Sequence, residues 1–223
     1  MRLFISLILF GLCFQGLNAQ KASKVDFDSI YSVIHQKGSE FEYSKLHDRF
    51  RNGSVLSDRE LFLLYYGYTA HRDYNPYNMS EMELQNHIRE NGYGKTDKLE
   101  EEVFNNNHVS IVACLARAMR YKMRNDTGLM NIWVNNYYGL LRAIRRSGDG
   151  RSEASAFVTN SITDEYQILR YFNLNFTMQL NLERYDAFEL VEPNEFGEKR
   201  IYFDKIKSRE FLNRHFNDKQ VAD

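Results

Sequence analysis

The sequence predicts an α+β protein: an N-terminal helical bundle of antiparallel hairpins, then a small, mainly antiparallel sheet with one crossover helix and a C-terminal helix. Two observations support this fold class. Apolar residues recur at helical spacing from Asp26 to about Arg146. After the turn cluster Ser147–Gly150, polar and apolar residues alternate as in strands, most clearly from Leu174 to Leu182. We therefore expect a helical region over 20–147, a sheet region packed on it over 148–216, and a tail over 217–223.

The first 19 residues have the pattern of a secretory signal peptide. Arg2 supplies a positive charge, Leu3 to Leu17 is an apolar run, and Ala19 is the small residue at the expected cleavage site. A retained anchor is the alternative, whereas a lipid on Cys13 is disfavoured by the large Leu12 before it. We expect an exported protein, located in the periplasm, on the cell surface or outside the cell. No later segment is apolar for long enough to span a bilayer.

The composition predicts a globular protein that is held together by its core. The chain is 43% hydrophobic and has only 2 prolines, which argues against a disordered stalk. Its formal net charge of −1 leaves no basic excess for nucleic acid. After cleavage Cys114 is the remaining cysteine, so an intrachain disulfide is excluded.

The stretch from Ser57 to Tyr77 is predicted to organise the helical region. Ser57 and Glu60 have the spacing of a capping box, in which each side chain binds a free backbone N–H of the first turn. The helix that follows is apolar or aromatic around nearly its whole circumference, so we expect it to be buried. Pro76 prevents its continuation.

The remaining helices follow from caps, apolar spacing and glycines. Ser80 with Glu83 predicts a second capping box, and two longer helices form a hairpin that turns at Thr127-Gly128. The expected helices are Asp26–Gly38, Phe41–Phe50, one beginning at Ser57, one beginning at Ser80, Leu99–Phe104, His108–Met123 and Leu129–Ile144.

The sheet region is predicted from short alternating segments. The strand with the strictest alternation, Leu174 to Leu182, should be half buried, with one apolar face against the core. The expected elements are a strand at Ala156–Val158, a helix at Thr163–Phe172, strands at Leu174–Leu182, Tyr185–Val191 and Arg200–Ile206, a hairpin loop at Pro193–Gly197, and a final helix that contains Phe211, Leu212 and Phe216.

Several segments together resemble a known family. They are "YYGYT" followed by "DYNPY", then "SGDG", "DEYQILRYF" and the pair "YDAFEL" and "IYFDKI". This combination, which spans roughly Val25 to Ile206, resembles the domain of unknown function 4919 family of exported proteins in Bacteroidetes-type bacteria. The resemblance implies a bacterial exported protein, and it carries no activity and no site residue.

Familiar catalytic and metal-binding patterns do not occur in the sequence. There is no G-x-S-x-G, P-loop or G-x-G-x-x-G, and Cys114 falls in a helix that should bury and inactivate its thiol. We therefore expect no cofactor. The histidines have no metal-ligand spacing, so we expect no metal site and, for most of them, a solvated surface position; they are His35, His47, His71, His87, His108 and His215.

Two hypotheses for a functional site remain open at this point. Glu165 and Asp204 are candidate catalytic acids if the protein is an envelope hydrolase with dispersed carboxylates. The loop from Tyr74 to Tyr77, with His71 beside it, is a candidate aromatic platform for a glycan or peptide. Core tyrosines whose hydroxyls reach the surface would explain the same loop without a ligand.

The leading prediction is a non-enzymatic interaction or accessory module of the cell envelope. It follows from the signal peptide, the helical hairpins and the lack of a catalytic constellation. Its partner would be another envelope protein, a glycan or a peptide, and we expect no binding to nucleic acid.

Overall fold

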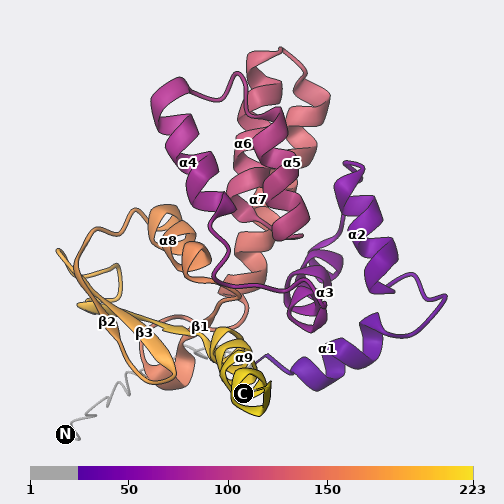
Figure 1. Ribbon diagram of the computed structural model, residues 1–223. Helices are drawn as coiled ribbons and strands as arrows, with labels where there is room; N and C mark the ends of the chain where they lie inside the picture. Colours follow the sequence, from indigo (N-terminus) through magenta and orange to yellow (C-terminus); the bar gives the residue numbers. More distant parts are fainter. Residues whose placement is uncertain (1–24, 223) are drawn as a thin grey trace, which may run out of the picture.

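The α+β class is confirmed by the computed structural model, which describes residues 25–222 and the side chains of residues 25–215. The predicted signal peptide at 1–19 and Cys13 lie outside the described residues. Figure 1 shows α4–α7 on one side of the molecule, α1–α3 on another, and α8 with the sheet on a third. The helices before the sheet are α1 Phe27–Ile34, α2 Tyr43–Arg51, α3 Asp58–Gly67, α4 Ser80–Asn91, α5 Asp97–Asn106, α6 Ile111–Met123 and α7 Thr127–Arg145.

The helix starts show where local sequence signals succeed and where one fails. Ser57 and Glu60 form the predicted capping box at α3. The box predicted for Ser80 and Glu83 is wrong: Ser80 is the first helical residue of α4, and its N–H donates to Oδ1 of Asn78 at 2.8 Å. An Asn two residues upstream thus satisfies the N–H that would otherwise have no partner.

The predicted hairpin of α6 and α7 turns slightly earlier than expected. The turn lies at Arg124–Asp126, where Asn125 has a positive φ of 57°, and Thr127 already begins α7. Asp126 caps α7 by accepting a hydrogen bond from the N–H of Leu129 at 3.0 Å. The two helices pack along their lengths.

Helix α3 is the buried centre of the helical region, as predicted. Leu61, Leu64, Tyr65 and Tyr66 are each 0% exposed, and the helix packs against α1, α2 and α7. A 3₁₀ turn, η1 (Tyr68–Ala70), continues it toward the loop that leads to α4.

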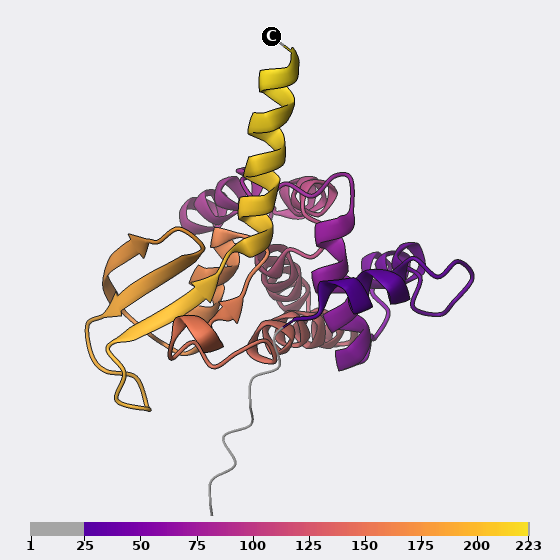
Figure 2. The ribbon, with the colours of Figure 1, turned by 90° about the horizontal axis from the view of Figure 1, so that it is seen from below.

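A mainly antiparallel sheet follows, with strand order β1-β4-β3-β2. β3 pairs antiparallel with both β2 and β4, whereas β1 pairs parallel with β4. α8 is the predicted crossover helix after β1, and α9 runs on through the residues expected to be a tail, projecting from the body in Figure 2. The elements are β1 Phe157–Val158, α8 Ile162–Tyr171, β2 Phe176–Asn181, β3 Tyr185–Leu190, β4 Arg200–Asp204 and α9 Ile206–Ala222.

The apolar residues of β2 are more exposed than the alternation predicts. Phe176 is 36% exposed and Met178 is 47% exposed. β2 is the edge strand, and a register shift between these two residues pairs Phe176 with Leu190 and Met178 with Glu189, so their side chains point to opposite faces of the sheet. Tyr166 of α8 lies on the Phe176 face, with ring centroids 5.9 Å apart, and its hydroxyl donates to Oε1 of Gln179 at 2.9 Å. The expectation of a single apolar face on this strand is therefore wrong.

Hydrogen bonds from buried tyrosines join α3 to the segment around β1. The Tyr65 hydroxyl donates to Oδ2 of Asp164 at 2.8 Å, and the Tyr66 hydroxyl donates to the Val158 carbonyl at 3.0 Å. The Asn160 side-chain amide in turn donates to the Tyr65 carbonyl at 2.6 Å. The helical and sheet regions therefore share one polar network inside a common core.

None of the helices within residues 25–222 combines the length and the apolar character needed to cross a membrane.

The contact between α3 and α7 can be tested with two substitutions in one helix. A Cβ at Gly139 would overlap the Leu61 side chain, so Gly139→Ala should lower the free energy of unfolding by about 1–3 kcal/mol. At Gly128, in the first turn of α7, a Cβ meets only ordinary contacts, so Gly128→Ala should raise it by up to about 1 kcal/mol. Urea unfolding measures both, and an equal effect at the two positions would contradict the close packing of α3 on α7.

Candidate functional sites

The two tyrosines of the predicted platform lie in different environments. Tyr74 is 4% exposed, and its hydroxyl donates to the Asn160 carbonyl at 2.7 Å, so its ring belongs to the core. Tyr77 is 45% exposed, and its ring centroid lies 6.3 Å from that of Phe211 in α9. His71 is half-buried: its ring centroid lies 4.5 Å from that of His108, and its side chain also lines a surface pocket of about 260 Å³ together with Tyr74 and Phe211. Tyr77 is the more exposed aromatic side chain of the pair, whereas Tyr74 and His71 meet at this pocket.

The candidate acids Glu165 and Asp204 lie on opposite sides of the sheet. Glu165 is fully buried on α8, where the charges of Asp186 and Lys205 influence its pKa. Asp186 pairs with Phe203 across β3 and β4, so the side chains of Asp186 and Phe203 point to the same face of the sheet, the one that Glu165 faces. Asp204 is the next residue along the strand, and its side chain therefore points to the other face. The two carboxyl groups do not face each other across a cleft.

Asp204 is held by several structural partners, whereas among the described residues Glu165 has a hydrogen bond with the Thr159 hydroxyl at 3.4 Å and an Oε2 without a partner. Asp204 accepts hydrogen bonds from the Arg184 guanidinium at 2.6–3.1 Å and from the N–H of Ile206 at 3.0 Å, which caps the start of α9. Burial, and then the charge of Asp186, raise the pKa of Glu165 well above its usual range. These surroundings favour the neutral form of the Glu165 carboxyl.

A second pair of buried carboxyl groups lies where α4 meets α8. Glu81 is 3% exposed and accepts hydrogen bonds from the Asn107 amide at 3.1 Å and from the Ser110 hydroxyl. Burial, and then the nearby Glu81, raise the pKa of Asp164 to about 7, and burial also raises the pKa of Glu81. Two neighbouring carboxyl groups that are both shielded from water cannot both be ionised without a large free-energy penalty. The pair is enclosed and holds the elements together.

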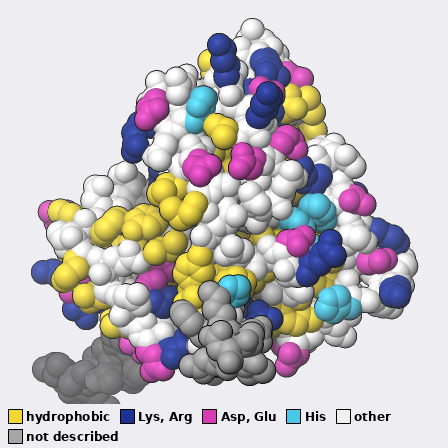
Figure 3. Space-filling model, in the orientation of Figure 1, with side chains coloured by type: hydrophobic (Ala, Val, Ile, Leu, Met, Phe, Trp, Pro, Cys, Tyr) yellow, Lys and Arg dark blue, Asp and Glu magenta, His cyan; other side chains and the backbone are white. Residues whose placement is uncertain are grey.

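Three histidines that are far apart in the sequence come together between α2, η1 and the turn before α6. The His108 ring lies against those of His47 and His71, with centroids 4.2 and 4.5 Å apart. Asp73 stands at the rim, and its Oδ2 lies 3.5 Å from Nδ1 of His71. Figure 3 shows histidine side chains at the surface beside α2, next to acidic and basic ones. Sequence reasoning missed this group because its members lie on three separate elements and form no spacing motif.

Two imidazoles in this group, those of His47 and His108, have a pKa below the ordinary value. Burial, and then the charges of His47 and His71, lower the pKa of His108 to about 4. Burial, followed by Arg51, also lowers the pKa of His47. Neutral imidazoles have a free nitrogen lone pair, which a proton, a hydrogen-bond donor or a metal ion can use.

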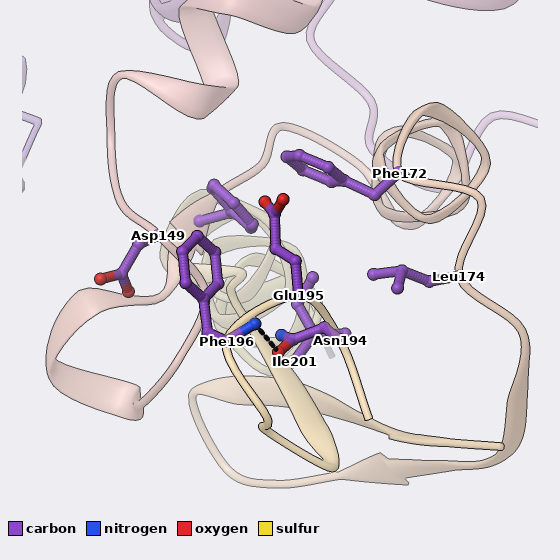
Figure 4. Close-up of a pocket in the computed structure, with 8 residues that line it drawn as sticks. Asp149, Phe172, Leu174, Asn194, Glu195, Phe196 and Ile201 are labelled. Carbon is purple, nitrogen blue, oxygen red and sulfur yellow. Dashed lines mark hydrogen bonds between the residues drawn. The ribbon is translucent and has the colours of Figure 1, made fainter. Parts of the chain in front are cut away.

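An apolar pocket of about 130 Å³ lies between the end of α8 and the loop that joins β3 to β4. Figure 4 shows the Phe172 and Phe196 rings on either side of it, with the Glu195 carboxylate extending between them. The remaining wall comes from buried or half-buried apolar residues: Phe157, Leu174 and Ile201. The pocket thus combines aromatic walls with an acidic group at its mouth.

The loop that carries Glu195 is held in a defined shape. Oδ1 of Asn194 accepts hydrogen bonds from the N–H groups of Phe196 and Glu198, each at 3.0 Å. The Arg151 guanidinium lies 5.2 Å from the centroid of the Phe196 ring and also bonds Glu198 at 3.1 Å. Glu195 itself forms no ion pair among the described residues. Its charge is therefore available to a ligand.

The pKa of Asp164 predicts how stability depends on pH. The unfolded chain ionises this carboxyl near its ordinary pKa of 3.8, whereas the folded chain does so only near 7. Between pH 3.8 and pH 7 the folded chain keeps a proton on Asp164 that the unfolded chain has released. The contribution of this carboxyl to the free energy of unfolding is therefore full below pH 3.8 and is lost as the pH rises to 7. The loss is at most about 1.4 kcal/mol for each pH unit.

Asp164→Asn should remove this contribution. Urea unfolding from pH 4 to 8 would show the free-energy difference between variant and parent moving in favour of the variant as the pH rises. Asp28→Asn, at an exposed position in α1, serves as the control. A constant difference for Asp164→Asn across the series would contradict the raised pKa.

Comparison with known proteins gives one result. The model of the family described as "Domain of unknown function (DUF4919)" matches residues 28–214, from α1 into α9. Neither the search of the curated proteins nor that of the solved structures found a match. Because the family model covers most of the chain, this protein belongs to the DUF4919 family.

Proposed function

We propose that this protein is an exported, non-enzymatic binding module of the cell envelope, and that the pocket beside Glu195 binds an alkylammonium group. The export part rests on the signal-peptide pattern of residues 1–19. The binding part rests on one observation, the aromatic pocket that has an unpaired carboxylate at its mouth. The cation could belong to a small molecule or to a lysine-rich segment of an envelope partner.

The chemistry of the pocket favours a cation that carries apolar substituents. The face of a phenyl ring attracts positive charge, and a cation desolvated against such a ring gains about 2 kcal/mol. Phe196 already has the Arg151 guanidinium near its ring. An ammonium group between Phe172 and Phe196 would face a second ring and the charge of Glu195, while its alkyl groups contact the apolar wall.

Other readings have less support. A hydrolase that uses Glu165 and Asp204 would need the two carboxyl groups in one cleft, and they lie on opposite faces of the sheet. A platform at the Tyr74–Tyr77 loop would rest mainly on Tyr77, because Tyr74 is only 4% exposed. The pocket in Figure 4 is the better-supported site because it is concave and has polar and aromatic groups that converge.

The charge requirement can be tested with two probes of the same shape. Choline should bind the mature protein in calorimetric titration or saturation-transfer NMR, and its neutral isostere 3,3-dimethyl-1-butanol should bind at least about tenfold more weakly, a difference of about 1.4 kcal/mol. Glu195→Gln should weaken choline binding to the level of the isostere. Glu192→Gln makes the same change at an exposed position earlier in the loop and should leave binding intact. Equal binding of the two probes, or equal effects of the two variants, would refute the alkylammonium assignment.

Export has its own test. When the full chain is produced in a bacterial host with a functional secretion system, the mature protein should begin at Gln20 and should leave the cytoplasm. N-terminal sequencing of the fractionated protein measures both. An intact N-terminus in the cytoplasmic fraction would contradict export while leaving the pocket assignment untouched.

A further inference from the structure

The histidine group between α2, η1 and α6 contains the donors of a metal site. His71, Asp73 and His108 each offer one ligand atom, and these atoms all lie within 4.8 Å of one another. Two histidines and one carboxylate are a donor set that proteins use for zinc and for non-haem iron. His71 and Asp73 lie on the loop after η1, and His108 lies in the turn before α6, so a bound ion would connect two separate segments.

The surroundings of His108 resemble the support that metal-bound histidines have. The Tyr43 hydroxyl lies 3.2 Å from Nδ1 of His108, which fixes the ring and leaves Nε2 as its free nitrogen. The His108 ring is also stacked on His47 and is 7% exposed, so its position is fixed by packing. A ligand nitrogen held in this way needs little reordering when an ion binds.

A second observation points to a missing ligand. Nε2 of His47 is buried and has no hydrogen-bond partner among the described residues. A buried polar atom without a partner costs about 1–3 kcal/mol, and such atoms are rare in folded proteins. The His47 ring lies against that of His108, with centroids 4.2 Å apart, so this unpartnered nitrogen lies next to the group of donors.

We propose that His71, Asp73 and His108 bind a divalent transition-metal ion of the zinc type. Bonds of about 2.0–2.2 Å place the donors of a tetrahedral zinc ion about 3.3 Å apart, so donors that lie within 4.8 Å of one another need to approach by at most about 1.5 Å. Asp73 has a side chain that is 50% exposed, and His71 lies on the same surface loop, so both can make this movement. Arg72, the cation next to Asp73, is 89% exposed and free to turn toward solvent. Three protein donors leave one position for water or for a ligand.

The test is a titration of the tag-free mature protein with ZnCl₂, followed by calorimetry and by the thermal midpoint. One equivalent of Zn²⁺ should bind and should raise the midpoint, because the ion binds only the folded chain. Asp73→Asn and His71→Ala, both at the surface, should each weaken Zn²⁺ binding at least tenfold. His35→Ala removes an exposed histidine of the α1 end and should leave the affinity unchanged.

Cobalt titration identifies the geometry independently of affinity. Co²⁺ in a tetrahedral nitrogen and oxygen site should give intense visible absorption, which Zn²⁺ should then remove by competition. Each variant is first compared with the parent by circular dichroism without metal, so that misfolding is recognised. Zn²⁺ affinity that is unchanged in both site variants, or lowered as much by His35→Ala, would overturn the proposal. It stands apart from the alkylammonium pocket, because the two sites share no residue.

Discussion

The hydroxyl groups of the α3 tyrosines are the constraint on which the structure depends. Tyr65 and Tyr66 are completely buried, so their hydroxyls must find partners inside the protein. Those partners are the Val158 carbonyl and the Asp164 carboxyl, which belong to the sheet side of the molecule. A buried hydroxyl left without a partner costs about 1–3 kcal/mol, so the docking of α8 and β1 against α3 is fixed by polar groups as well as by apolar area.

Local signals in the sequence were sufficient to predict most of the helices and strands. The capping box of Ser57 and Glu60, the apolar circumference of α3 and the alternation from Leu174 to Leu182 all depend on neighbours in the chain. Each lies in an element of the structure, the last of them in β2. The Ser80–Glu83 box failed because Asn78, outside the helix, competes for the same N–H group. The faces of β2 could not be predicted because the register shift between Phe176 and Met178 interrupts the alternation, and because burial of a strand face depends on helices that are distant in the sequence.

The sites could be predicted less well than the fold. His47, His71 and His108 converge only because α2, the η1 loop and the turn before α6 meet, and no spacing rule encodes that meeting. The environment of Asp164 depends in the same way on Glu81, which is 83 positions away in the chain and adjacent in space. The sequence shows which residue types are present for such a site, because histidines and carboxylates are the side chains that most often have perturbed pKa values and bind ions. It does not show which of them meet in space.

The hydrogen bonds between α3 and the segment around β1 also determine where the chain can be cut to make shorter recombinant fragments. The turn Ser147–Gly150 follows the last helix of the bundle and would be the natural place to end a shorter recombinant fragment. A fragment that stops there would keep Tyr65, Tyr66 and Tyr74 but lose every hydrogen-bond acceptor that their hydroxyls use from Val158 onward. Its exposed apolar face would then favour aggregation over folding, so we expect the helical half to fold only together with the sheet region.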